Sequence, residues 1–259
     1  MKIIFTDLDG TLLDTNTYSY EKAHDALELI KKSDIPLVFC TSKTRAEIEF
    51  WRKKIGNKDP FISENGGGIF IPKDYFSFHF LYDKEDKNYF IIKLGTYYDQ
   101  LVDIINLLKE KYEILSFSDM TSNEIAKDAN LELSQAKLAK QREFDVPFKI
   151  LNKKQEKDIL NEIKKHGLHY TVGGRYYHLL GDNNKGEAVK ILLYLFRERY
   201  GSISSIGTGD SENDFQMLDV VDNGYLVMKS DGTYASHHYR KAKGVGPEGW
   251  NDIIKREIL

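Results

Sequence analysis

The sequence predicts an α/β fold, with a parallel sheet covered by helices on both faces and a smaller α+β domain inserted into it. Short apolar runs recur along the chain and end near small or polar residues, which is typical of buried strands. Amphipathic segments of helical spacing lie between them, and this alternation favours a parallel sheet. The alternation stops in the middle of the chain and resumes with Lys185. We therefore expect a core in 1–82 and 183–259 and an insertion in 83–182.

The expected core elements follow one another in the order strand, helix, strand. The strands are the apolar runs 3–5, 36–40, 69–71 and 204–206, and the helices are the segments 20–32, 45–54 and 185–200. The insertion is richer in strands, which we expect at 89–95, 113–117, 146–151 and 170–179, around helices at 98–111 and 154–166. The last of these strands is interrupted by Gly173-Gly174.

The composition excludes several classes of protein. The 259 residues are 41% hydrophobic and 30% charged, which suits a globular chain rather than a disordered one. A net charge of -3 offers no large attraction for nucleic acid or an anionic membrane, so we expect a small-molecule partner. Cys40 is the only cysteine, which excludes an intrachain disulfide and a thiolate metal cluster. No apolar stretch approaches the length of a membrane span, and we expect cytoplasmic residence.

The sharpest motif is Asp7-Leu8-Asp9-Gly10-Thr11, directly after the first apolar run. Strand alternation places Asp7 and Asp9 on the same side, and Gly10 lets the backbone turn sharply near a ligand. Two like charges so close are tolerated best with a cation between them or a proton on one of them. A strand-ending turn built on a side-chain carboxylate explains one aspartate well but two poorly.

A second acidic group, Gly209-Asp210-Ser211-Glu212-Asn213-Asp214, follows another predicted strand. Because the carboxyl ends of parallel strands meet at one edge of a sheet, Asp7 and Asp210 are expected to share one metal ion. Oxygen ligands without a convincing histidine or cysteine set favour Mg²⁺ over zinc. The simpler interpretation of Ser211 to Asp214 is a helix cap.

Polar residues also follow the strand that ends at Cys40. Thr41 and Ser42 are suited to a phosphoryl oxygen, and Lys43 lies just beyond them, near a helix start that favours an anion. Lys185 opens the helix on which the core resumes, where its ammonium can neutralise the carboxylates. Alone, the Thr-Ser pair is more often a helix cap and the lysine a surface charge.

The ordered set Asp-x-Asp, Thr, Lys and Gly-Asp-x-x-x-Asp resembles the motifs of the haloacid dehalogenase superfamily, and the match covers both ends of the chain. The resemblance implies a Rossmann-like core, and the insertion looks like the type IIB cap of this superfamily. It further implies that Asp7 attacks phosphorus, that Asp9 is the acid and base, and that Thr41 and Lys185 stabilise the phosphoryl group. Mg²⁺ is then held at Asp7, Asp9, Asp210 and Asp214, with Asp9 contributing only its backbone carbonyl and Asp214 either binding the ion or orienting its waters.

A narrower resemblance rests on the segments 41–47, 61–67, 141–143 and 246–251. Together they look like those of mannosyl-3-phosphoglycerate phosphatases, and Ser42, where most type IIB phosphatases have glycine, is similar to this group. The implied substrate is a phosphorylated sugar glycerate, in the synthesis of the compatible solute mannosylglycerate. Its carboxylate calls for cationic donors, so we expect substrate contacts from Ser42 and Lys43 in the core and from Arg142, Glu143, Gly174 and Arg175 in the cap. A surface role for the two arginines is about as plausible.

Other functions stay open at this point. The same fold serves phosphatases of other sugar phosphates, such as sucrose phosphate or glucosyl-3-phosphoglycerate. A phosphomutase would use the same nucleophile but return the phosphoryl group to a sugar. A non-catalytic sensor of sugar phosphates is less favoured, because it need not keep a nucleophile and an acid. The sequence does not predict an oligomeric state.

Overall fold

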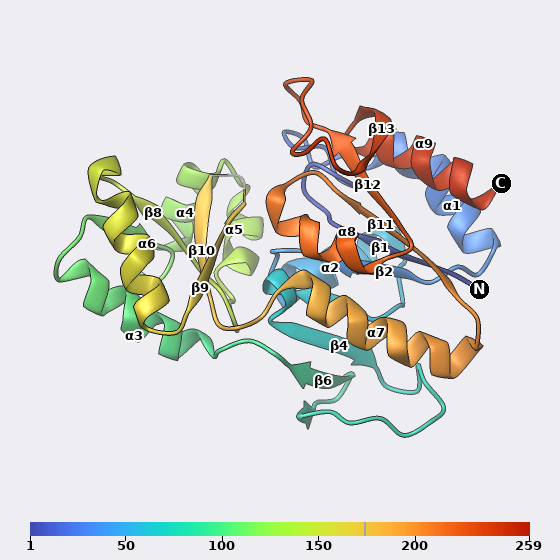
Figure 1. The fold of residues 1–259 in the computed structure, drawn as a ribbon, viewed down its shortest axis with the longest axis horizontal. Helices are drawn as coiled ribbons and strands as arrows, with labels where there is room; N and C mark the ends of the chain where they lie inside the picture. Colours follow the sequence, from blue (N-terminus) through green and yellow to red (C-terminus); the bar gives the residue numbers. More distant parts are fainter. Residues whose placement is uncertain (174) are drawn as a thin grey trace.

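The computed structural model of the protein describes residues 1–173 and 175–259, which form two parts lying side by side (Figure 1). The larger part contains a nine-stranded sheet whose strands, in spatial order, are β13 (Arg240–Val245), β12 (Asn223–Met228), β11 (Ser204–Gly209), β1 (Lys2–Thr6), β2 (Leu37–Cys40), β3 (Phe61–Ser63), β4 (Gly68–Pro72), β6 (Tyr89–Lys93) and β5 (Lys84–Glu85). The six strands from β13 to β3 are parallel to their neighbours, whereas β4, β6 and β5 are antiparallel.

Helices cover both faces of this sheet, which confirms the expected α/β class. One face is covered by α1 (His24–Lys32), α2 (Arg45–Ile55) and α9 (Pro247–Ile258), and the other by α7 (Lys185–Tyr200) and α8 (Phe215–Val220). The alternation along β1 explains the two layers, since Ile4 packs into one apolar cluster while Ile3 and Phe5 pack into the other. Single 3₁₀ turns lie at Glu21–Ala23, Glu64–Gly66, Lys153–Gln155 and Glu212–Asp214.

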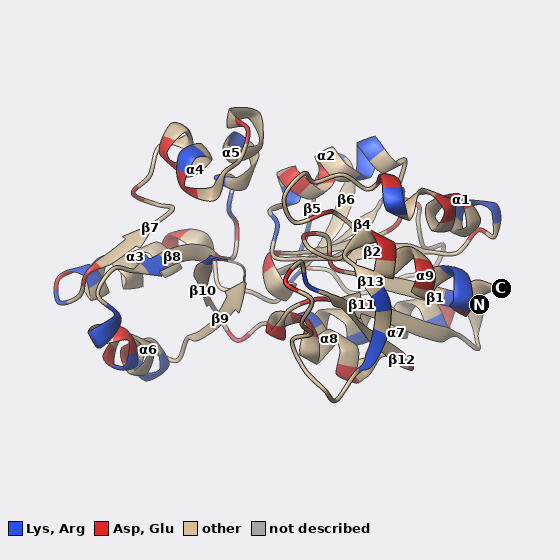
Figure 2. Cartoon of the chain, turned by 90° about the horizontal axis from the view of Figure 1, so that it is seen from above, with Lys and Arg blue, Asp and Glu red and all other residues tan. Residues whose placement is uncertain are grey.

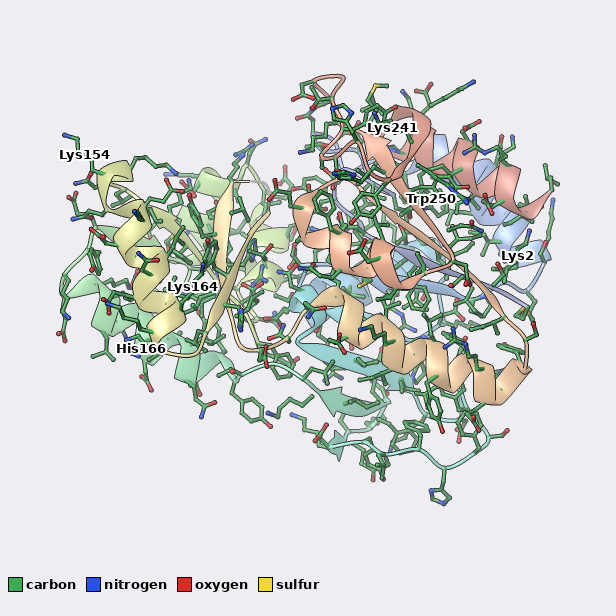
Figure 3. The ribbon with its side chains drawn as sticks, viewed as in Figure 1. Lys2, Lys154, Lys164, His166, Lys241 and Trp250 are labelled. Atoms are coloured by element: carbon green, nitrogen blue, oxygen red, sulfur yellow. The ribbon has the colours of Figure 1, made fainter. Side chains whose placement is uncertain are left out.

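Two local contacts fix helices against the central strands. Thr44 caps α2, because its side chain accepts the N–H of Glu47 at 3.1 Å while the Glu47 carboxylate accepts the N–H of Thr44. The cap of this helix is therefore Thr44 and not the Thr41-Ser42 pair. Trp250, on α9 and labelled in Figure 3, is fully buried, and its Nε1 donates to Thr6 Oγ1 at 3.0 Å.

The smaller part is built on a four-stranded antiparallel sheet, in the order β7 (Ile114–Ser116), β8 (Val146–Ile150), β10 (Tyr176–Leu180) and β9 (His169–Gly173). Helices α3 (Tyr98–Lys109) and α6 (Glu156–Lys165) pack on one face, and α4 (Ser122–Ala129) and α5 (Leu133–Ala139) on the other. The segment expected as one interrupted strand at 170–179 is thus a hairpin of two strands. Gly174, between them, lies outside the described residues.

Two expectations about the core sheet are corrected. The strand at 69–71 is β4, which is antiparallel to β3, because a tight turn connects the two strands instead of a helix. The strand expected at 89–95 in the insertion is β6, which pairs with β4 and belongs to the larger sheet. Its alternate residues explain this placement, since Tyr89 and Ile91 pack into one cluster of the core while Phe90 and Ile92 pack against the other. The sheets therefore do not divide at residue 83.

The two connections between the parts run beside each other. A Cβ on Gly181 would lie 2.8 Å from the backbone nitrogen of Thr96, and one on Gly95 would lie 3.0 Å from the Cα of Gly67. Glycine is needed at these positions because backbone passes so close to its neighbours.

Acidic and basic residues are interspersed along the helices of both parts (Figure 2). None of the helices in the described part of the chain is both long and apolar enough to cross a membrane.

Candidate active site

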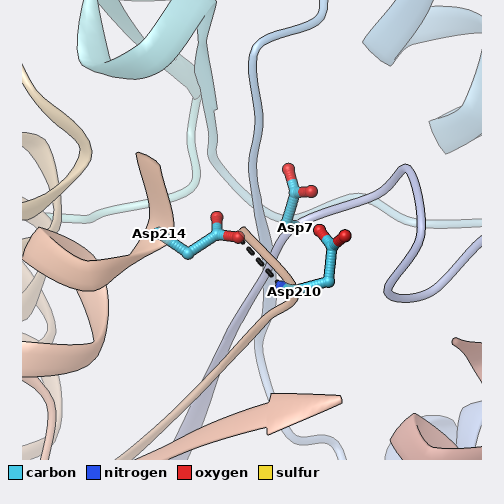
Figure 4. A group of neighbouring side chains, drawn as sticks. All are labelled: Asp7, Asp210 and Asp214. Carbon is cyan, nitrogen blue, oxygen red and sulfur yellow. Dashed lines mark hydrogen bonds between the residues drawn. The ribbon is translucent and has the colours of Figure 1, made fainter. Parts of the chain in front are cut away.

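Three carboxylates meet where parallel strands β1 and β11 end. Thr6 is aligned with Thr208 in these strands, so the segments that follow them start side by side. Asp7 follows β1, Asp210 follows β11, and Asp214 lies one helical turn further on. Each offers an oxygen atom, and these three atoms lie within 4.8 Å of one another (Figure 4). The expected meeting of Asp7 and Asp210 at one sheet edge is present in the structure.

Lys185 lies among these carboxylates and is itself buried. Its Nζ is 2.9 Å from Asp7 Oδ1 and 2.6 Å from Asp214 Oδ1. Asp214 Oδ2 accepts the backbone N–H groups of Asp210 and Ser211, each at 3.0 Å, and Figure 4 draws the first of these bonds. Asp214 therefore completes the capping box that Ser211 begins and also faces the cluster. Both oxygens of Asp214 are already hydrogen-bonded. Asp214 is therefore better placed than Asp210 is to orient neighbouring groups.

Burial and the repulsion between neighbouring carboxylates raise the pKa values of Asp210 and Asp214. Burial raises the pKa of Asp210, and the neighbouring Asp214 and Asp7 carboxylates add to this effect. Burial likewise raises the pKa of Asp214, against the opposing influence of Lys185. One ammonium faces three carboxylates, so the cluster keeps an excess of negative charge. Oxygen ligands with excess negative charge fit a hard divalent cation such as Mg²⁺.

Glycine lets the acidic segments approach one another. Gly10 has a φ of +72°, and a Cβ there would lie 2.8 Å from Asp210 Oδ2. A Cβ on Gly209 would lie 2.4 Å from the Cβ of Asp214. Any side chain at either position would push the carboxylates apart, so these glycines belong to the construction of the site.

The carboxylates of Asp9 and Asp7 pair with different lysines. Asp9 Oδ2 lies 2.8 Å from Lys43 Nζ, and Lys43 also pairs with Glu47 at 3.3 Å. The Asp9 side chain is 41% exposed to the pocket, yet its Oδ1 is buried without a partner among the described residues. Enclosure by protein raises the pKa of Asp9, and Lys43 only partly opposes this. Lys43, expected to bind substrate, thus first binds this carboxylate.

A pocket of about 230 Å³ lies between the two parts, above these residues. The core contributes Asp7, Asp9, Ser42, Lys43 and Asp210 to its lining, and the smaller part contributes Phe117, Arg142, Gly173, Arg175, Tyr176 and His178. Thr41, Asp214 and Lys185 are buried behind the lining. The Oγ1 of Thr41 accepts the N–H of Lys43 at 3.4 Å, so its hydroxyl proton stays available.

The residues expected in the cap differ in their placement. Arg142 lines the pocket, but its Nη1 donates to the Ser42 carbonyl at 2.8 Å and its Nε to the Ala139 carbonyl at 3.0 Å. Arg142 therefore ties the two parts together. Arg175 is exposed in the lining, and its Nη1 donates to Asp128 O at 3.3 Å. Glu143 is not among the lining residues, and Gly174 lies outside the described residues.

Sequence reasoning missed a set of residues that join the two parts beneath the pocket. His178 pairs with Asp145, Asp145 accepts from Asn65, and Asn65 accepts from Asn213. Asn65 and Asn213 lie in segments that the sequence marked, 61–67 and 209–214, and Asn65 adopts a φ of +56° that is unusual for a residue with a side chain. No local spacing connects the other members, because they come from separate elements.

Comparisons with known proteins agree with this geometry. A family model of haloacid dehalogenase-like hydrolases matches residues 4–236. The chain is 44% identical to the glucosyl-3-phosphoglycerate/mannosyl-3-phosphoglycerate phosphatase of Methanococcoides burtonii, over 97% of this chain and 95% of that protein. It is 37% identical to the mannosyl-3-phosphoglycerate phosphatase of Pyrococcus furiosus, over 88% and 91% of the two chains. The chain therefore belongs to the haloacid dehalogenase-like hydrolases.

The fold also has a counterpart among solved structures. A subclass IIB sugar phosphatase of the haloacid dehalogenase superfamily superimposes with a TM-score of 0.66 over all of both chains, at 15% identity. The expected core with a separate α+β cap is confirmed, and the smaller part is called the cap from here on. The resemblance to mannosyl-3-phosphoglycerate phosphatases, and with it the expected enzyme class, is confirmed by the named relatives.

Proposed function

We propose that this chain is a Mg²⁺-dependent phosphatase that converts mannosyl-3-phosphoglycerate to mannosylglycerate and phosphate. One observation carries the proposal: Asp7, Lys185, Asp210 and Asp214 meet at the floor of a pocket that the cap closes from above. The printed names of the relatives support the substrate. The relative from Methanococcoides burtonii is named for both sugars, so we expect the glucosyl compound to be turned over as well.

Asp7 is the nucleophile in this proposal. Lys185 holds its Oδ1, which leaves Oδ2 without a hydrogen bond to another described residue and facing the pocket. Attack on phosphorus forms an aspartyl-phosphate and divides one difficult displacement into two easier ones. Thr41 and Lys185 donate to the phosphoryl oxygens as charge develops on them.

Asp9 supplies the proton to the departing alkoxide of the glycerate. Its raised pKa favours the protonated form needed for this step, and Lys43 holds the carboxyl group at the pocket wall. The same carboxylate then takes a proton from the water that hydrolyses the aspartyl-phosphate. Because Asp9 is paired with Lys43, its side chain is separate from the acidic cluster. Its backbone carbonyl remains our proposed metal ligand.

Asp7, Asp210 and the carbonyl of Asp9 would hold Mg²⁺, with Asp214 orienting the groups around it. When bound, the ion neutralises the carboxylates and the phosphoryl oxygens. In the cap, Arg142 and Arg175 are the cationic residues of the pocket lining and are proposed to attract the glycerate carboxylate. Glu143 lies away from the pocket lining, so its proposed sugar contact is the weakest of the set.

Phosphate release tests this proposal. The substrates are mannosyl- and glucosyl-3-phosphoglycerate, sucrose phosphate and simple hexose phosphates, each with Mg²⁺ and with chelator. We expect the two phosphoglycerates to be preferred and chelator to abolish turnover. Equal turnover of all substrates would contradict the narrow assignment. Transfer of phosphate to a second sugar, without release, would indicate a phosphomutase.

Asp7→Asn tests the covalent step. An amide is a poor nucleophile, so we expect turnover to fall by about 10⁴-fold or more. The matched control is Asp182→Asn, because the side chain of Asp182 is 97% exposed. Substrate binding without turnover by the wild-type chain would support a sensor. Near wild-type turnover by Asp7→Asn would refute the covalent mechanism.

A further inference from the structure

We propose that His178, on β10 of the cap, accepts a hydrogen bond from a hydroxyl group of the substrate's sugar through its Nε2, and that Asp145 positions its ring. The inference rests on the proposed function, since it assigns a contact to the leaving-group side of the same pocket. It adds a specificity-determining residue that neither the sequence motifs nor the arginines of the cap supply.

The orientation of the imidazole ring is fixed by Asp145. His178 Nδ1 lies 2.9 Å from Asp145 Oδ1 and 2.8 Å from Asp145 Oδ2. A carboxylate only accepts hydrogen bonds, so these partners assign the proton of a neutral ring to Nδ1. The lone pair is then on Nε2, and a sugar hydroxyl is the kind of donor that it binds.

Asp145 is in turn held from the core. It is completely buried, and its Oδ2 accepts from Asn65 Nδ2 at 3.0 Å and lies 3.8 Å from Arg142 Nη1. Asn213 Nδ2 donates to Asn65 Oδ1 at 3.0 Å. Two residues of the core thus brace a histidine of the cap, so the ring is placed before substrate arrives.

The other side of the ring borders the pocket, although His178 as a whole is only 5% exposed. His178 lines the same pocket as Asp7 and Asp9, and its Nε2 makes no hydrogen bond to a residue in the described part of the chain. Gly173 is near on the neighbouring strand β9, and a Cβ there would sit 3.4 Å from Nε2. A larger side chain at this position would cover the nitrogen. A buried histidine with only a packing role would be expected to have both ring nitrogens hydrogen-bonded within the protein.

The decisive variant is His178→Asn. The amide nitrogen of asparagine can replace Nδ1 as the donor to Asp145, while the atom corresponding to Nε2 is lost. Gly173→Val is the second variant, because it leaves His178 in place and covers Nε2. The control is His169→Asn, since His169 is exposed on the neighbouring strand β9.

Each variant is assayed with mannosyl-3-phosphoglycerate and with p-nitrophenyl phosphate, whose leaving group has no hydroxyl. Losing one hydrogen bond to a substrate hydroxyl lowers kcat/KM by about 10- to 100-fold. We expect this loss in His178→Asn and Gly173→Val on the sugar substrate, largely in KM. On p-nitrophenyl phosphate the change should stay within about threefold. The control should match the wild type on both.

Equal losses on both substrates, or no loss on either, would overturn the assignment of His178. Failure of the proposed function looks different, because the wild-type chain would then prefer another sugar phosphate. The same selective loss measured on that substrate would still support the role of His178. The assignment of His178 would be overturned if the wild-type chain hydrolysed no phosphate ester of a sugar-containing alcohol better than p-nitrophenyl phosphate.

Discussion

Lys185→Met is expected to destabilise the protein in a way that depends on pH. Lys185 is 1% exposed and neutralises two carboxylates at 2.9 and 2.6 Å, while methionine preserves most of its apolar volume. Removing one partner of a buried ion pair lowers the free energy of unfolding by about 3–5 kcal/mol. The stranded carboxylates can escape part of this loss by taking up a proton.

The pH dependence of this loss follows from the free energy needed to protonate a carboxylate. Protonation costs about 1.4 kcal/mol for each unit by which the pH exceeds the pKa of the carboxyl group. Burial already raises the pKa of Asp214 and of Asp210, so one of them takes up the proton. Between pH 7.5 and pH 5.5 the loss should shrink by about 2–3 kcal/mol. We therefore expect about 3–5 kcal/mol at the higher pH and about 1–2 kcal/mol at the lower.

The measurement is urea unfolding of the chelator-treated protein at both pH values. Lys190→Met is the control, because Lys190 lies on the same helix but forms an exposed pair with Glu187. It should lose less than about 1 kcal/mol. A loss in Lys185→Met no larger than in this control, or one that is the same at both pH values, would refute this account of the cluster.

Further predictions concern the cluster and the helix contacts. A carboxyl group whose pKa is raised on folding stabilises the protein below its unfolded pKa of about 4, and this contribution is lost as the pH rises. The chelated wild-type protein should therefore lose stability in urea as the pH rises above about 4, and Asp210→Asn should flatten that slope. Trp250→Phe should destabilise by about 1 kcal/mol more than Trp51→Phe, because only Trp250 donates its Nε1 to a described partner; equal unfolding midpoints would contradict this. Thr44→Ala should lower the free energy of unfolding by about 1–2 kcal/mol, which is more than the loss expected for Thr121→Ala. Both threonines begin a helix with a capping box, but only Thr44 also donates a hydrogen bond to Leu138 O in the cap domain. Equal losses in thermal unfolding of the two variants would show that the hydrogen bond from Thr44 to Leu138 O is unimportant.

The sequence predicts the acidic floor of the site well because its signals are local. Asp7 and Asp210 each follow a short apolar strand, and parallel pairing alone brings such strand ends together. The edge of the sheet is harder to predict. β6 carries the same apolar residues as a cap strand would, and only its pairing with β4, which no local signal encodes, assigns it to the core.

Residues that act through distant partners are the hardest to predict. His178 and Asp145 belong to different strands of the cap, and Asn65 belongs to a turn of the core. The residue types of Arg142 and Lys43 suggest anion contacts, but the sequence does not reveal that their donors are already bonded to Ser42 O and to Asp9.

The two adjoining connections between core and cap determine which residues can move. Because the chain crosses twice at nearly the same place, beside Gly95 and Gly181, any rotation of the cap has its pivot there. Lys185 begins α7 four residues after that pivot and stays still while the cap turns. Phe117 and Arg175, which line the pocket from the cap, would move with it. The protein can thus admit and release a bulky substrate without disturbing the geometry of its nucleophile.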